Sequence, residues 1–148
     1  MQPSEFPLAL SYGIAHAKEL LNDKQILVVT GAGVSTDSGI PDYRGAGRVQ
    51  KHPLTFDQFM GSASNQARYW ARSFVGWNRV ASAEPNLAHT ALAEAEKQAK
   101  IFQIITQNVD GLHQRAGSKA VLELHGRLDR VLCSSCGDIL SRNELDGR

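Results

Sequence analysis

A glycine turn and a polar cluster share residues 26–45, which read ILVVTGAGVSTDSGIPDYRG. The four apolar residues that open this stretch are typical of a buried parallel strand. Gly31 and Gly33 have no Cβ, so a phosphate group can approach the backbone N–H groups of the turn closely. Residues 42–44 place an aspartate, a tyrosine and an arginine side by side, which suits an amide, a ring and a phosphate respectively. The stretch therefore predicts a site for a phosphorylated, ring-bearing ligand. Its candidate binding residues are Gly31, Ala32, Gly33, Ser35, Ile40, Pro41, Asp42, Tyr43 and Arg44.

A second polar cluster, residues 106–113 (TQNVDGLH), ends the apolar run IFQIIT. Ligands of an open α/β sheet lie beyond the carboxyl ends of its strands, so we expect this cluster beside the glycine turn. Its amides and carboxylate can hydrogen-bond ribose hydroxyls and a carboxamide. The same residues also suit an ordinary strand-to-helix turn with an aspartate or asparagine cap. The candidate binding residues here are Gln107, Asn108, Val109 and Asp110.

His125 follows a third apolar run, residues 121–124, and precedes Gly126. Its place at a strand end is the only feature that separates it from the other four histidines. An imidazole titrates near neutral pH, which suits the transfer of a proton, so His125 is a candidate catalytic residue that could equally be an ordinary histidine of the turn.

The two cysteines, Cys133 and Cys136, form a C-x-x-C pair that Gly137 follows. Both thiolates of such a knuckle can bind one zinc ion, and zinc in a structural site needs four ligands. A redox pair is the alternative, although the flanking aromatic and proline residues of that class are missing. We expect half of a zinc site here.

The elements that must position these residues form an α/β pattern. Strands are expected at residues 26–30, 101–106 and 121–124, and helices at 8–22, 65–79 and from Asn86 onward, with a short helix after Thr55. We expect a stripe of Trp70, Phe74 and Trp77 to face the core, and an apolar stripe on the helix after Asn86. That stripe comprises Leu87, Ala91, Leu92, Ala95 and Ala99. The predicted fold is a partial doubly wound, Rossmann-like parallel sheet, with residues 1–127 in this domain and residues 128–148 in an incomplete zinc-binding module.

Composition narrows the function class. The 148 residues are 42% hydrophobic and 21% charged, and the net charge is +1. This charge gives no electrostatic reason to expect binding to nucleic acid or to an anionic membrane. No apolar run is long enough to span a bilayer, and residues 1–10 fit neither a secretory signal nor a transit peptide. Two closely spaced cysteines favour a reducing setting, so we expect a cytoplasmic protein.

Four motifs, in this order, resemble those of the sirtuins, which are NAD-dependent protein deacylases. They are GAGVSTDSGIPDYR, TQNVD, LELHG and CSSCG, and the likeness extends over about residues 10–137. Residues 68–77 and 128–137 look closest to class II sirtuins. The resemblance implies NAD as cosubstrate, acyl-lysine proteins as substrates and a structural zinc ion far from the chemistry.

The resemblance also implies a mechanism. The acyl-lysine oxygen attacks C1 of the ribose, nicotinamide leaves, and the acyl group passes to ADP-ribose. His125 is then the general base and Asn108 orients the ribose. Tyr43 and Arg44 are implied to cover and hold the cosubstrate, and Asp110 to hold its carboxamide together with Ile40.

Other interpretations stay open. Sirtuins carry a further C-terminal part with the second cysteine pair and the adenine side of the site, so a truncated, inactive or partner-completed NAD or ADP-ribose binder is one alternative. Protein mono-ADP-ribosyltransfer is another. A nicotinamide dehydrogenase is less well supported, because the third glycine of its fingerprint would fall at Thr36. Residues 45–53 are a candidate lid or a simple connector.

Overall fold

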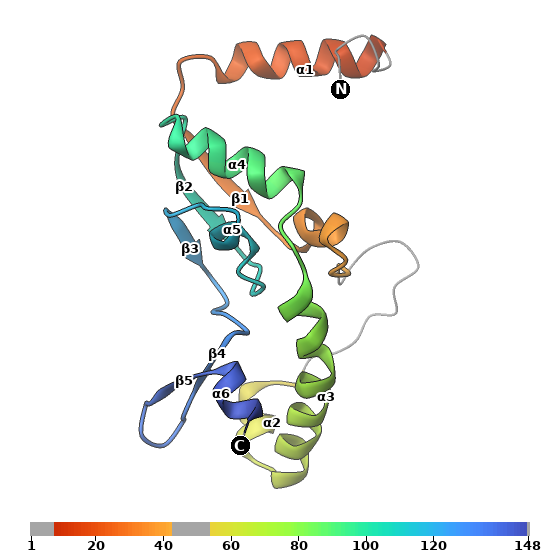
Figure 1. Ribbon diagram of the computed structural model, residues 1–148, viewed down its shortest axis with the longest axis vertical. Coiled ribbons are helices and arrows are strands. Elements are labelled where there is room, and N and C mark those ends of the chain that lie inside the picture. The colour runs from red at the N-terminus through yellow and green to blue at the C-terminus, as the bar shows by residue number, and fades with distance from the viewer. Residues whose placement is uncertain (1–7, 43–53, 148) are drawn as a thin grey trace.

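A parallel three-stranded sheet forms the centre of the computed structural model, which describes residues 8–42 and 54–147. The strands β1 (Ile26–Thr30), β2 (Ile101–Thr106) and β3 (Val121–Glu123) lie in the order β1-β2-β3. Figure 1 shows the sheet with α4 (Leu87–Lys97) along it. The prediction of a Rossmann-like parallel sheet is confirmed.

The register of this sheet brings the three strand ends together. Thr30 pairs with Thr106, and Thr106 pairs with Glu123. The loops that leave the strands therefore start side by side at one edge. They lead into the 3-10 helix η2 (Ala32–Ser38), the helix α5 (Leu112–Arg115) and the turn that carries His125.

One face of the sheet is buried beneath α4 and α5. Ile104 and Leu112 have no exposed surface, and Ala93 of α4 is 2% exposed. Asn86 caps α4 as predicted, because its side chain accepts the N–H groups of Ala88 and His89.

The buried side of α4 differs from the predicted apolar stripe. Leu87 is 89% exposed, whereas His89 is fully buried and Ala93 nearly so. The helix is thus rotated relative to the prediction, since the capping box formed by Asn86 and His89 turns the histidine inward.

The opposite face of the sheet is open to solvent. Leu27 is 47% exposed, Val29 64% and Leu122 49%. Val29, Ile105 and Leu122 are successive partners across the strands, so these side chains share one face. The prediction that residues 26–29 form a fully buried strand is therefore wrong for this face. α1 (Leu8–Leu21) extends away from the sheet (Figure 1).

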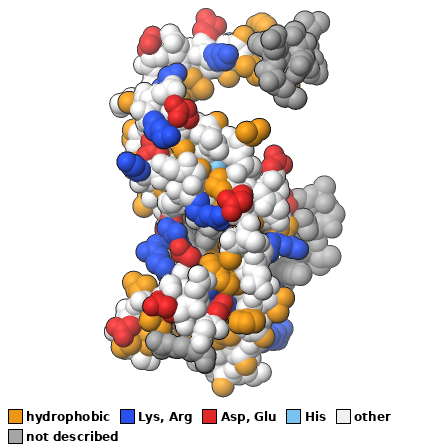
Figure 2. All heavy atoms as spheres, viewed as in Figure 1, with side chains coloured by type: hydrophobic (Ala, Val, Ile, Leu, Met, Phe, Trp, Pro, Cys, Tyr) orange, Lys and Arg blue, Asp and Glu red, His pale blue; other side chains and the backbone are white. Residues whose placement is uncertain are grey.

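A second group of elements lies at the far end of the molecule (Figure 1). It contains α2 (Phe56–Met60), α3 (Ala63–Ser82), the antiparallel pair β4 (Arg130–Leu132) and β5 (Ile139–Ser141), and α6 (Arg142–Asp146). The predicted short helix after Thr55 is α2, and Thr55 forms a capping box with Gln58. In Figure 2, hydrophobic side chains reach the surface at this end. No helix within the described residues is long and apolar enough to cross a membrane.

The packing centre of this group is an arginine. The guanidinium of Arg142, which is 3% exposed, lies 5.4 Å from the ring centre of Trp70 and 5.8 Å from that of Trp77. It also donates to Ser73 and Asp146. Phe74 is 56% exposed, so the expected core-facing aromatic stripe is only partly correct.

Candidate functional site

Three side chains from two loops form a hydrogen-bonded chain at the carboxyl edge of the sheet. The hydroxyl of Ser35, in η2, donates to Asp110 Oδ2 at 2.7 Å and accepts from Asn108 Nδ2 at 3.0 Å. Ser35 is fully buried and Asn108 is 9% exposed. The structure therefore joins the two polar clusters that the sequence predicts at one edge.

Backbone contacts fix the turn that carries Asn108. Gln107 N–H donates to the carbonyl of Thr30 at 3.0 Å, and Asn108 N–H donates to Thr106 Oγ1 at 3.0 Å. Asp110 Oδ1 accepts the N–H of Leu112, the first residue of α5, at 2.9 Å, although the N-cap residue of this helix is Gly111. The same carboxylate therefore binds both Ser35 and the start of α5.

The backbone conformation at Gly31 and Gly33 does not require glycine at either position. Gly31 has a φ of −141°, which any residue adopts, and Gly33 is not among the glycines with positive φ. An ideal Cβ on either residue would meet no atom of the described residues within 4 Å. Among these residues nothing therefore fills the position of a side chain at Gly31 or Gly33, and a bare backbone there fits the close approach of a phosphate group.

The remaining predicted residues have different surroundings. Ile40 N–H donates to the carbonyl of Ser35 at 3.3 Å and follows Gly39, whose φ of 82° ends η2. Gln107 is exposed, whereas Ala32, Pro41 and Asp42 are half-buried. Tyr43, Arg44 and the candidate lid at residues 45–53 lie outside the described residues.

His125 lies at the same edge and is exposed. Its Nδ1 is 3.1 Å from the carbonyl oxygen of Gln107. A carbonyl only accepts hydrogen bonds, so Nδ1 carries the hydrogen and Nε2 is the bare nitrogen that can accept a proton. The turn of His125 is also held by Leu128, whose N–H donates to the carbonyl of Val109 at 2.9 Å.

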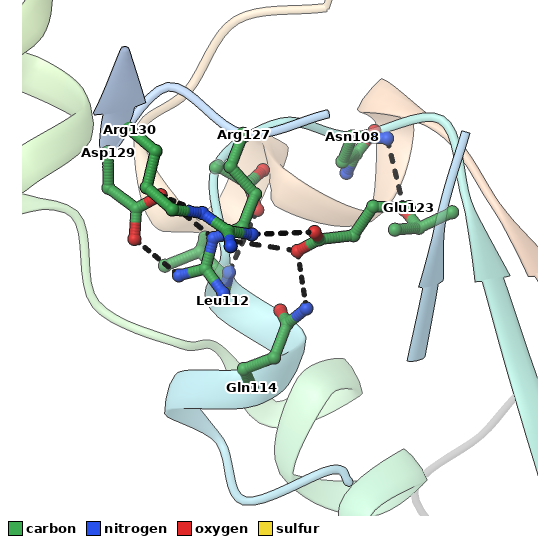
Figure 3. A network of polar contacts seen from close by, with 9 residues as sticks. Asn108, Leu112, Gln114, Glu123, Arg127, Asp129 and Arg130 are labelled. Atoms are coloured by element: carbon green, nitrogen blue, oxygen red, sulfur yellow. Dashed lines mark hydrogen bonds and ion pairs between the residues drawn. The ribbon is translucent and has the colours of Figure 1, made fainter. Parts of the chain in front are cut away.

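A network of charged and polar side chains, which includes Glu123, Arg127 and Arg130, flanks His125 in the sequence (Figure 3). Glu123 accepts from Gln114 at 2.6 Å and lies 3.6 Å from Arg127 Nε and 3.4 Å from Arg130 Nη2. Arg127 also donates through Nε to Asp129 Oδ1 at 2.8 Å. These contacts join β3, α5 and β4 on both sides of His125.

Close packing accompanies this network. Gly111 has a φ of 72°, and a Cβ there would lie 3.1 Å from Arg127 Nη2. Sequence reasoning did not identify the network, although the alternating charges at residues 123–130 are a signal that could have indicated it.

The cysteine pair lies on the exposed turn between β4 and β5. Cys133 N–H donates to the carbonyl of Asp138, and Gly137, with a φ of 79°, donates to the carbonyl of Cys133. The backbone N–H groups of Cys136 and Ser135 lower the pKa of the Cys133 thiol, which favours the thiolate that zinc binds. Within the described residues, no group of three or more histidine, cysteine or acidic side chains could hold a metal ion. The pair therefore fits half of a zinc ligand set.

Comparison with known proteins gives consistent matches. The model of the Sir2 family matches residues 31–148. The chain is 53% identical over 129 residues to the NAD-dependent protein deacylase SIR4 of Monosiga brevicollis, and 49% identical over 130 residues to the human NAD-dependent protein lipoamidase sirtuin-4, mitochondrial. These alignments cover 87% and 84% of this chain but 42% and 41% of the relatives.

A solved structure described as Sir2–p53 peptide–NAD+ is similar in fold, with a TM-score of 0.78 and 39% sequence identity. The match covers 88% of this chain and 53% of that chain. This chain thus spans about half of the length of the proteins it matches.

Proposed function

Because the chain belongs to the Sir2 family, we propose that it carries the nicotinamide and ribose side of the site of an NAD-dependent protein-lysine deacylase. The observation that carries this proposal is the hydrogen-bonded chain of Asn108, Ser35 and Asp110, with the bare nitrogen of His125 at the same edge. The relatives named as NAD-dependent deacylases and deacetylases support it, as does the Sir2–NAD+ structure.

The residues at the edge of the sheet fit NAD as cosubstrate. The bare backbone at Gly31 and Gly33 suits the phosphates, and the amide of Asn108 suits a ribose hydroxyl. Asp110 retains unused acceptor positions on its carboxylate for the carboxamide, which it is proposed to hold together with Ile40. Tyr43 and Arg44 are proposed to cover and hold the same ligand.

NAD supplies the ADP-ribose that accepts the acyl group when the acyl-lysine oxygen displaces nicotinamide. The part of His125 is to remove a proton from a ribose hydroxyl through Nε2, while the carbonyl of Gln107 holds Nδ1–H and stabilises the imidazolium that results. Asn108 orients the ribose through its side-chain amide, which Ser35 holds in place. Acyl-lysine proteins are the proposed substrates.

Cys133 and Cys136 are proposed as two of the four ligands of a structural zinc ion. The turn that holds both exposed cysteines, closed by the hydrogen bond from Gly137 N–H to the carbonyl of Cys133, supports this part of the proposal. We assign residues 1–127 to the NAD-binding domain and residues 128–148 to the zinc-binding module, and we place the protein in the cytoplasm because its cysteines fit a reducing compartment.

A second candidate function is an NAD or ADP-ribose binder that a further polypeptide completes. It differs from the deacylase in one respect, since it predicts binding of ADP-ribose without turnover.

The test measures nicotinamide release from NAD in the presence of an acetyl-lysine peptide. The chain is compared with His125→Ala, and with His16→Ala, which removes an exposed histidine of α1. Peptide-dependent release over many turnovers that His125→Ala abolishes and His16→Ala retains supports the deacylase, because nicotinamide leaves before the step of His125 and only repeated turnover requires that step. ADP-ribose binding by calorimetry without release supports the binder, and the absence of both refutes the proposal for this chain.

A further inference from the structure

Two histidines that the proposed chemistry does not use are buried behind the site. His89 of α4 is fully buried, and His113 of α5 is 1% exposed. Their ring centres are 4.9 Å apart, and the rings meet edge to face at 62°. Burial removes the ring nitrogens from water, which costs free energy wherever a nitrogen lacks a hydrogen-bond partner inside the protein.

His113 is connected to the site through two hydroxyls. Its Nε2 lies 2.9 Å from Thr30 Oγ1, and the Thr30 hydroxyl donates to Thr106 Oγ1 at 2.8 Å. Thr106 Oγ1 in turn accepts the backbone N–H of Asn108 at 3.0 Å. A continuous path of three hydrogen bonds thus runs from the ring of His113 to the backbone of Asn108.

The direction of these bonds identifies the form of His113. Since the Thr30 hydroxyl donates to Thr106, it accepts from Nε2–H of His113. Nδ1 of His113 is then the nitrogen without hydrogen, and it is buried without a hydrogen-bond partner in the described structure. A proton added at Nδ1 would be buried beside His89, whose own Nε2 is also buried and unpartnered.

The groups around the pair favour the neutral rings. Burial is the main cause that lowers the pKa of both histidines, and His89 lowers the pKa of His113 further. Asp110 is the charged group that acts in the opposite direction on both rings. Thr30 of β1, which contacts His113, and Thr106 of β2, which contacts Thr30, do not titrate, and Arg115 of α5 is paired with Glu84.

We propose that His113, backed by His89, is a positioning residue for Asn108. Its neutral ring fixes the Thr30–Thr106 hydroxyl pair, and this pair fixes the backbone of the turn that presents the Asn108 amide. Protonation of the ring places a charge beside His89 and loosens this support. The inference rests on the proposed function only for its consequence, which is weaker ADP-ribose binding in mild acid.

The experiment follows the 15N-labelled 148-residue chain by NMR from pH 7.5 to pH 5. The ring signals of His113 and the backbone N–H signal of Asn108 are recorded together. We expect His113 to titrate below the ordinary histidine value of about 6.5, and the Asn108 signal to move with the midpoint of His113. In His113→Gln, which keeps a side-chain N–H donor but does not titrate, the Asn108 signal should lose this inflection.

A second arm measures ADP-ribose affinity by calorimetry. His113→Leu and Thr30→Val should each weaken binding about fivefold, the effect of one lost neutral hydrogen bond, and the double variant should not add the two effects. His113→Gln should restore most of the affinity at pH 7.5 and remove its decline in acid.

An Asn108 signal that stays fixed while His113 titrates would overturn the inference, as would a His113 ring that titrates at or above the ordinary histidine value of about 6.5. If the wild-type chain binds no ADP-ribose at any pH, the proposed cosubstrate site is refuted for this chain. The NMR titration needs no ligand and then decides the positioning role alone.

Discussion

Removal of one buried hydroxyl tests the architecture of the candidate site. Ser35 Oγ donates to the carboxylate of Asp110 at 2.7 Å and accepts from Asn108 Nδ2 at 3.0 Å, with no exposed surface. A hydrogen bond to a charged group contributes about 1.5–3 kcal/mol and one between neutral groups about 1 kcal/mol. Because Asp110 is only half-buried, water replaces part of the lost donor, so we expect Ser35→Ala to lower the free energy of unfolding by about 2 kcal/mol.

Urea denaturation monitored by circular dichroism gives this free energy, and calorimetry with ADP-ribose gives the effect on binding. The matched control is Ser38→Ala, since Ser38 lies in the same 3-10 helix and its Oγ is buried without a partner among the described residues. Ser38→Ala should change stability by less than about 0.5 kcal/mol. Equal effects of the two substitutions would refute the argument, because burial alone and not the link between the two clusters would then explain the loss.

Three further predictions concern the packing and pH dependence of the fold. Arg142→Met should lower the free energy of unfolding by about 1–3 kcal/mol, because it breaks a buried ion pair and a stack on two tryptophan rings. Tryptophan fluorescence in urea measures this change, and an unchanged midpoint would contradict the packing role of Arg142. Stability should decrease as the pH falls below the ordinary histidine value of about 6.5 and through the lower folded pKa values of His89 and His113, because the unfolded chain binds these protons first. His113→Gln should flatten that pH dependence of the urea midpoint, and an unaltered slope would be evidence against the pair. Ile104→Ala should lower the unfolding free energy by about 2–5 kcal/mol, whereas Val29→Ala, on the open face, should have a much smaller effect in the same urea assay; comparable losses would show that this face is covered in solution.

The sheet and the meeting of the two clusters could be predicted because each strand is a short apolar run that ends in glycine or polar residues. Parallel strands place those ends at one edge, so Ser35 and Asp110 had to lie close together. The partners in contact could not be predicted, since a serine and an aspartate 75 residues apart give no local signal of their hydrogen bond.

Predictions from helical periodicity were less successful. Histidine counts as a polar residue in an apolar stripe, so the burial of His89 was missed and exposed Leu87 was assigned to the buried face of α4. Trp70 and Trp77 were correctly placed on one side of α3, but their partner is the guanidinium of Arg142, which a search for apolar positions passes over. In both cases a polar side chain, His89 or Arg142, is buried where the hydrophobic pattern predicts an apolar residue.

The bare backbone at Gly31 and Gly33 has a consequence for the unfolded chain. Glycine leaves the unfolded backbone more conformational freedom than alanine does. Replacement of either glycine by alanine should therefore raise the free energy of unfolding by about 0.4–1 kcal/mol, since the added methyl group would meet no described atom. Folding alone therefore favours alanine at Gly31, and only an approaching ligand favours glycine. A Gly31→Ala chain that melts at a higher temperature and binds ADP-ribose more weakly would show that glycine lowers the stability of this turn but lets a ligand reach its backbone N–H groups.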